Sequence, residues 1–133
     1  MFEKYFTPWE ATQCLPLVKA VTADILRKGQ RIRSVMEHDA NEERMTEIRS
    51  LEEEIAGLMR ELEELGCFFK DWNFEIGLVD FPAVINGATV MLCWRSDEAK
   101  LRWYHGVEDG FAGRKLIPEN LLDEELTGSG SGG

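Results

Sequence analysis

The chain has 133 residues, of which 44% are hydrophobic and 30% are charged, and its formal net charge is −10. These values are typical of one globular domain with an apolar core, and they exclude an intrinsically disordered chain. The net acidity argues against a nucleic-acid-binding surface, and no apolar run is long enough to predict a membrane span.

The first predicted element is a long helix that begins in the stretch FTPWE. Thr7 can cap this helix, Pro8 fits the first helical position, and Glu10 completes a capping box. Pro16 lies inside the helix, so we expect a kink near residues 12–16. Apolar residues continue the helical three- and four-residue spacing up to position 35: Val18, Val21, Ile25, Ile32 and Val35.

A second helix is predicted after a break at HDAN. Asn41 is its expected N-cap, and Gly66 stands where a left-handed terminating residue belongs. The helix between them has a heptad stripe made of Met45, Ile48, Leu51, Ile55, Leu58, Leu62 and Leu65. Residues 8–36 have a charge of about +3 and residues 42–65 of about −6, so the two helices should attract each other. We therefore predict an antiparallel helical hairpin over residues 8–65.

After Gly66 the pattern changes to the alternation of β-strands. The predicted strands, within residues 67–105, are CFFKD, VDFPAVI, ATVMLCWR and KLRWYH. Asn86-Gly87 predicts a two-residue hairpin turn, and SDEA predicts a four-residue turn. Pro82 cannot donate to a ladder, which places its strand at an edge or beside a bulge. The predicted fold class is α+β, a long antiparallel two-helix hairpin packed on a small antiparallel β-sheet.

The lengths of the two turns predict the register of the sheet. The first turn pairs Ile85 with Ala88, and the second pairs Val90 with His105. His105 then points to the apolar face that the helices cover. Asp80 falls on the opposite face, so we do not expect Asp80 and His105 to form a dyad.

His105 is the main candidate for chemistry. One interpretation is a partly buried histidine whose ring nitrogens are bonded by the following turn. Another is a general acid–base group at the mouth of a pocket, oriented by Glu108 or Asp109. Metal ligands would have to come from His105, Glu108, Asp109, Cys93 or Asp80, and His105 and Glu108 could share a site, although no H-E-x-x-H motif or cysteine pair predicts one. Cys93 has no predicted histidine on its face and is not expected to be a nucleophile.

The loop GVEDGFAGR, within residues 106–117, is the candidate ligand-binding segment. Gly110 and Gly113 can adopt positive φ and let backbone N–H groups converge, while Arg114 supplies a planar cation. With Trp103 contributing a ring, this combination could hold a small carboxylate or phosphate. The alternative is a tight connection in which Arg114 pairs with an acidic residue of the loop itself.

Four stretches together resemble a bacterial and archaeal family, domain of unknown function 2203: KYFTPWEA, LGCFFKDWNFEIGLVDFPA, LCWR and WYHGVEDGFAGR. The resemblance extends to about Ile117. The positions that match the family's motifs are Asp80, Phe81, Pro82, Cys93, Trp94, His105, Gly110, Gly113 and Arg114. Gly106 stands where the family commonly has glutamate, and Glu108 where it commonly has aspartate. The family brings no activity or cofactor to carry over.

These observations predict a single domain over residues 1–117, followed at 118–133 by an acidic tail and the stretch GSGSGG, which is typical of an engineered linker. The odd number and wide spacing of the cysteines favour reduced thiols in the cytoplasm. We expect a small binding module that forms a homodimer through its helical hairpin, with an anion site at the His105–Arg114 loop. The alternatives are an enzyme or metal-dependent protein that uses His105, Glu108 and Arg114, and a scaffold that engages another protein through the hairpin tip at residues 36–46.

Overall fold

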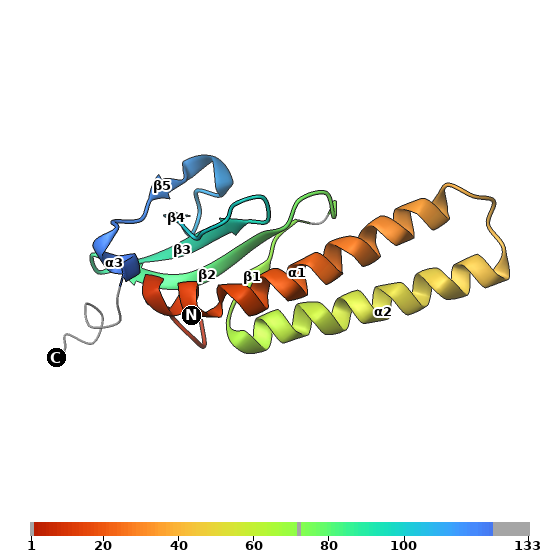
Figure 1. Cartoon of the computed structure of the whole chain (residues 1–133), viewed down its shortest axis with the longest axis horizontal. Coiled ribbons are helices and arrows are strands. Elements are labelled where there is room, and N and C mark those ends of the chain that lie inside the picture. The colour runs from red at the N-terminus through yellow and green to blue at the C-terminus, as the bar shows by residue number, and fades with distance from the viewer. Residues whose placement is uncertain (1, 72, 124–133) are drawn as a thin grey trace.

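A computed structural model of the chain describes residues 2–71 and 73–123, and it has the predicted α+β architecture. The helices α1 (Pro8–Met36) and α2 (Glu42–Leu65) form an antiparallel hairpin that extends well beyond the sheet (Figure 1). The sheet has the order β1-β2-β3-β4-β5, with every neighbouring pair antiparallel. Its strands are β1 (Phe68–Phe69), β2 (Leu78–Ile85), β3 (Ala88–Arg95), β4 (Trp103–Gly106) and β5 (Lys115–Leu116).

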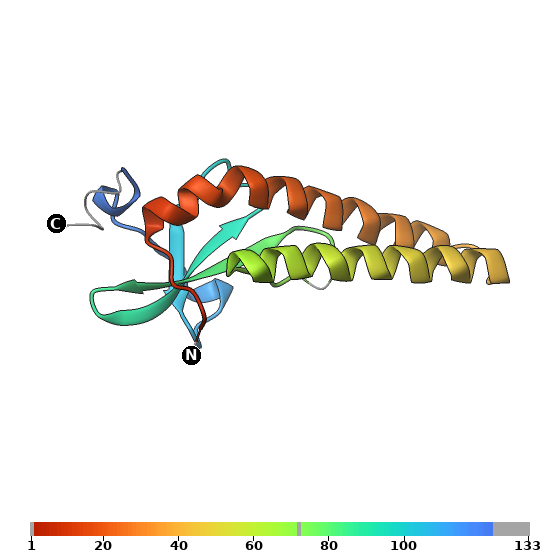
Figure 2. The ribbon, with the colours of Figure 1, turned by 90° about the horizontal axis from the view of Figure 1, so that it is seen from below.

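The predicted ends of both helices are confirmed by their hydrogen bonds. The Thr7 hydroxyl accepts from the Glu10 N–H at 3.0 Å, and the Glu10 carboxylate accepts from the Thr7 N–H at 2.9 Å. The Asn41 side chain caps α2, and Gly66 ends it with a φ of 105°. Pro16 is accommodated inside the continuous helix α1, which curves at its N-terminal end (Figure 2).

The expected attraction between the helices is carried by ion pairs across the hairpin. Arg31 pairs with Glu47 at 2.7 Å, and Lys28 pairs with Glu54 at 2.8 Å. These side chains are partly or largely open to solvent, which weakens both ion pairs. Packing therefore contributes more to the stability of the hairpin than its charges do.

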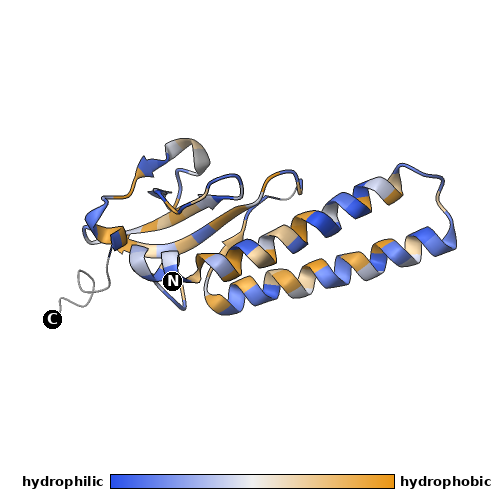
Figure 3. Ribbon diagram, in the orientation of Figure 1, coloured by the Kyte–Doolittle hydropathy of each residue, from blue (hydrophilic) through white to orange (hydrophobic). Residues whose placement is uncertain are grey.

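The core lies between α1 and one face of the sheet. Apolar residues are concentrated in the central strands and alternate with polar ones along both helices (Figure 3). The α1 side of this core consists of Ala11, Leu15, Val18, Val21 and Ile25, and the sheet side includes Val79, Phe81, Ala83, Leu92 and Trp94. Only Ile55 and Leu62 of α2 are buried. In the described part of the chain, neither long helix combines the length and the apolar content that crossing a bilayer requires.

The distal half of the hairpin has few partners within the chain. Met36 and Met45 are 68% and 41% exposed, while Val35 is buried by the hairpin itself. The predicted homodimer stays a prediction, because these two side chains are compatible with it but do not identify a partner.

Two glycines on the hairpin allow a direct test of its packing. Gly29 is buried in α1, and a Cβ atom there would lie 2.6 Å from the Cβ of Phe74, which is too close for the backbone nearby to remain in place. We expect Gly29→Ala to lower the free energy of unfolding by about 1–3 kcal/mol despite the higher helix propensity of alanine. Gly57 on α2 has no such neighbour, since its closest contact would be the Arg60 side chain at 3.7 Å. Gly57→Ala should instead stabilise the protein by about 0.5–1 kcal/mol.

Chemical denaturation of both variants checks this pair of predictions. Equal shifts in the same direction would mean that helix propensity alone decides the outcome and that Phe74 does not pack against Gly29 as described.

The first half of the predicted sheet register is confirmed. Ile85 lies opposite Ala88, Phe81 opposite Leu92 and Val79 opposite Trp94. The strand that contains Pro82 is not at an edge in the strand order, but Pro82 lies beyond the short strand β1. There its carbonyl accepts a hydrogen bond from the Phe6 N–H at 2.7 Å.

The second half of the predicted register is wrong by one residue. His105 lies opposite Met91 rather than Val90, and Cys93 lies opposite Trp103. The predicted four-residue turn does not form, because β4 begins only at Trp103 and residues 96–102 make a longer connection. A shift of one residue turns every side chain of a strand to the other face. His105 therefore points away from the helices, onto the face that carries Asp80.

Three short elements after β4 were not predicted. A 3₁₀ turn, η1 (Phe111–Gly113), precedes β5, whose residues pair with β4. The helix α3 (Asn120–Asp123) follows in the segment predicted as an acidic tail, and its Leu121 and Leu122 pack against the core. The predicted GSGSGG linker lies outside the described residues.

Candidate metal centre

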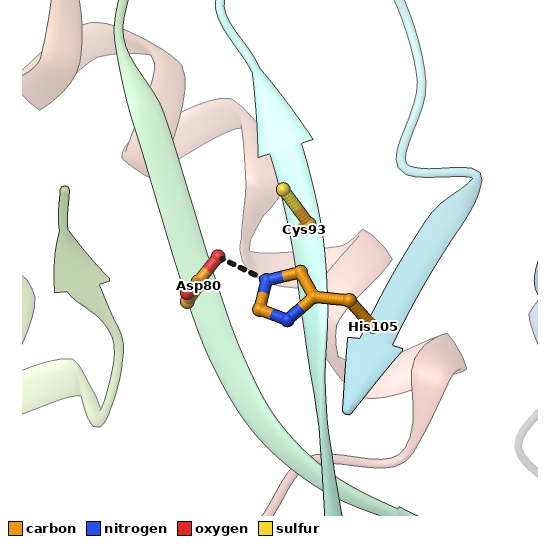
Figure 4. A group of neighbouring side chains, drawn as sticks. All are labelled: Asp80, Cys93 and His105. Atoms are coloured by element: carbon orange, nitrogen blue, oxygen red, sulfur yellow. Dashed lines mark ion pairs between the residues drawn. The ribbon is translucent and has the colours of Figure 1, made fainter. Parts of the chain in front are cut away.

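Three chemically different side chains meet on the face of the sheet opposite the helices. Asp80 of β2 lies directly opposite Cys93 of β3, and His105 of β4 reaches them from the next pair along the neighbouring ladder. Figure 4 shows the imidazole ring reaching from β4 across β3 toward Asp80, with Cys93 of β3 beside it. Figure 2 places η1 on this face, on the side of the sheet away from α1.

The donor atoms of this cluster are close together. His105 Nε2 lies 3.5 Å from Asp80 Oδ1, and one potential ligand atom from each of the three residues lies within 4.8 Å of the others. All three side chains are buried, with exposed fractions of 6% for Asp80, 1% for Cys93 and 4% for His105. The prediction that Asp80 and His105 lie on opposite faces is therefore wrong, and its cause is the shifted register of β4.

The imidazole of His105 is oriented by the backbone. Its Nδ1 lies 2.7 Å from the carbonyl oxygen of Gly106. A carbonyl only accepts hydrogen bonds, so Nδ1 must carry a proton and donate. In the neutral ring the lone pair is then on Nε2, the atom that faces Asp80. Metal-binding histidines commonly have this arrangement, with the second nitrogen donating to a carbonyl or carboxylate.

Burial changes the acidity of both partners of His105. It raises the pKa of Asp80, an effect that the nearby His105 and then Lys70 oppose without cancelling. Burial and, to a smaller extent, the Asp80 carboxylate raise the pKa of the Cys93 thiol to about 12. At neutral pH, Cys93 is therefore a protonated thiol that donates to Asp80, and it is not an activated nucleophile.

The geometry fits metal binding better than nucleophilic catalysis. A Cys–His–Asp triad needs the histidine to face the nucleophile with one nitrogen and the carboxylate with the other. In this cluster Nδ1 is bonded to Gly106, so Asp80 and Cys93 share the Nε2 side. Convergence of an imidazole, a carboxylate and a thiol is a donor set that suits divalent transition metals such as Zn²⁺.

Arg114, predicted to bind an anion, is already paired with a carboxylate. Its Nη2 lies 2.7 Å from Glu98 Oε2 and donates to the Cys93 carbonyl at 3.3 Å. Its guanidinium also lies over the Trp103 ring, 4.9 Å from the centroid. Arg114 thus ties the loop after β4 to β3 and to the connection between β3 and β4.

The glycines of the predicted anion loop surround an acidic side chain. A Cβ at Gly113 would lie 2.7 Å from the Cβ of Asp109, and one at Gly106 would lie 2.5 Å from its carboxylate. Among the loop's glycines only Gly110 has a positive φ, of 67°. Glu108, the predicted partner of His105 for proton or metal chemistry, is exposed, whereas His105 is buried. Glu108 and His105 are close in sequence, but the carboxylate that faces the His105 ring belongs to Asp80.

The sequence named Asp80 and Cys93 among the possible metal ligands but placed them on the face opposite His105, and Glu98 was not identified as a functional residue. The predicted register of the first hairpin correctly pairs Asp80 with Cys93, and the third member of that row is Trp103. Asp80, Cys93 and His105 all fall within the stretches that carry the family resemblance. A one-residue change in the assumed turn would have placed all three on one face.

Comparison with known families agrees with the resemblance found in the sequence. The family described as "Uncharacterized conserved protein (DUF2203)" matches residues 4–117. The chain belongs to this family. The DUF2203 match contains the whole Asp80–Cys93–His105 cluster and ends before α3. No curated protein and no solved structure matches the chain.

Proposed function

We propose that this member of the DUF2203 family is a metal-binding protein, in which Asp80, Cys93 and His105 hold a divalent transition metal such as Zn²⁺. The observation that carries the proposal is the convergence of three different donor atoms within 4.8 Å in a buried site. A tetrahedral zinc ion with normal bond lengths separates its nitrogen and oxygen ligands by about 3.3–3.5 Å. The 3.5 Å between His105 Nε2 and Asp80 Oδ1 fits that separation.

The chemistry of the donors narrows the class of metal. A thiolate and an imidazole favour Zn²⁺ and similar ions over Mg²⁺ and Ca²⁺, which prefer oxygen ligands throughout. Three protein ligands leave a fourth position for water or another small ligand. A free thiol that serves as a ligand persists best in a reducing compartment, and all three cysteines of the chain are free. The proposal therefore includes a cytoplasmic location.

Metal titration of the chelator-treated protein tests the proposal. We expect one equivalent of Zn²⁺ or Co²⁺ to bind, and the Co²⁺ complex to show a thiolate charge-transfer band in the near ultraviolet. His105→Ala should weaken binding by more than about 100-fold, beyond the effect typical of residues that only orient a ligand. Cys93→Ser should remove the charge-transfer band.

The chain provides matched controls for both variants. His38→Ala changes an exposed histidine at the hairpin tip, and Cys14→Ser changes a thiol on α1. Both should bind metal as the unchanged protein does. Binding that survives His105→Ala, or the absence of binding in the unchanged protein, would refute the proposal.

The anion-binding function predicted for the His105–Arg114 loop has less support. An anion at Arg114 would have to displace Glu98, whose carboxylate oxygens lie 2.7 and 2.8 Å from the guanidinium. It would also approach the Asp109 carboxylate beside Gly106. Both acidic groups disfavour a carboxylate or phosphate at that position.

A further inference from the structure

A cavity of about 560 Å³ lies between the first turns of α1, the connection before β4, and the segment from β5 to α3. This volume is in the range of small-molecule binding sites. None of the three candidate metal ligands lines it. Its α1 wall places it on the helical side of the sheet, whereas the metal ligands lie on the other face.

The floor of the cavity is apolar. Leu15 of α1, Leu101 of the connection and Ile117 after β5 are exposed by only 5%, 2% and 3%. Leu122 of α3 adds a half-buried apolar wall. A ligand with an apolar group of moderate size would bury it against these four side chains.

The rim of the cavity has both positive and negative side chains. Lys100 and Arg102 come from the connection before β4, while Glu119 and Asp123 lie at α3. Within residues 2–71 and 73–123, none of the four forms an ion pair. These two pairs of charges therefore do not pair with each other across the opening, and a third cation of the lining, Lys19 of α1, donates to the Ala99 carbonyl at 2.7 Å.

The α1 wall adds a hydrogen-bond acceptor. Thr12 and Pro16 both line the cavity. Pro16 has no N–H, so the carbonyl of Thr12, four residues earlier, lacks its helical donor. A ligand with an N–H or O–H group could satisfy that carbonyl.

We propose that this cavity binds a small zwitterion with an apolar side chain, of which an apolar α-amino acid is the simplest. The ligand carboxylate pairs with Lys100 and Arg102, and its ammonium group with Glu119, Asp123 and the Thr12 carbonyl. The apolar side chain packs on Leu15, Leu101, Ile117 and Leu122. A simple anion or cation would leave one pair of rim charges unused.

Calorimetric titration of the full chain with a matched set of compounds tests this proposal. L-Leucine or L-phenylalanine should bind at one site. Glycine, which lacks the side chain, N-acetyl-L-leucine, which lacks the ammonium group, and isoamylamine, which lacks the carboxylate, should each bind at least about tenfold more weakly. No saturable binding of the two amino acids, or equal binding of leucine and N-acetyl-leucine, would overturn the proposal.

Variants at the rim test the contacts of the ligand's carboxylate and of its ammonium group separately. Arg102→Ala should weaken leucine and N-acetyl-leucine alike, by about tenfold, and should leave isoamylamine unchanged. Asp123→Asn should weaken leucine and isoamylamine and leave N-acetyl-leucine unchanged. Arg49→Ala, on the exposed face of α2, is the control and should change nothing. Equal effects of Arg102→Ala on all ligands would contradict the assignment.

Discussion

The metal-free Asp80→Asn variant should be more stable than the unchanged protein at neutral pH, although it loses metal binding. Burial raises the pKa of Asp80, so the folded state holds the charged carboxylate less favourably than the unfolded chain does. Asparagine has a similar shape and no charge, and its amide can donate to His105 Nε2. We expect a gain of about 1 kcal/mol, because the substitution removes the desolvation cost of a buried charge and keeps a hydrogen bond to His105.

The pH dependence of this gain in stability follows from the direction in which folding shifts the pKa of Asp80. A carboxyl group whose pKa is raised on folding contributes its full stability below its pKa in the unfolded chain, which is about 3.9. That contribution is lost as the pH rises through the folded-state pKa. The difference between variant and unchanged protein should therefore grow from about pH 4 upward and vanish below it.

Urea denaturation between pH 4 and pH 8, with and without Zn²⁺, measures both halves of this prediction. Asp97→Asn is the control, because Asp97 is an exposed carboxylate paired with Arg95 and its pKa is lowered rather than raised. That variant should not gain stability at neutral pH, and it should keep its metal affinity. If Asp80→Asn destabilises the metal-free protein at pH 7, then Asp80 serves the fold and its burial is not a sign of function.

The hairpin could be predicted from sequence because its signals are local. Thr7, Glu10, Asn41 and Gly66 each act on backbone groups within a few residues, so their effects do not depend on the rest of the fold. Asn86-Gly87 is local in the same way. Asn86 and Gly87 both have positive φ, of 53° and 80°, as the tight turn requires.

The register of β4 could not be predicted because it depends on contacts between distant segments. Glu98 accepts from the Arg95 N–H at 2.8 Å and pairs with Arg114, sixteen positions later. Lys19 of α1 donates to the Ala99 carbonyl at 2.7 Å and holds the connection away from the ladder. These contacts lengthen the connection to β4 and set its pairing. The candidate metal site could not be predicted for the same reason, because its third donor, His105, is on β4.

Metal affinity should rise about tenfold for each unit of pH between about pH 6 and pH 8, because one proton leaves as the metal binds. The Cys93 thiol has a pKa of about 12, so it is protonated throughout this range, yet only its thiolate can bind the metal. Each unit of pH raises the concentration of the thiolate tenfold, and the apparent affinity follows.

Calorimetry in two buffers with different ionisation enthalpies counts the released protons directly. The unchanged protein and Cys14→Ser should both release about one proton or more, whereas Cys93→Ser should release fewer. Metal binding without proton release would exclude Cys93 as a ligand. The high pKa that makes Cys93 a poor nucleophile thus also makes metal binding steeply dependent on pH. Burial keeps the thiol protonated until a bound cation stabilises the negative charge of the thiolate.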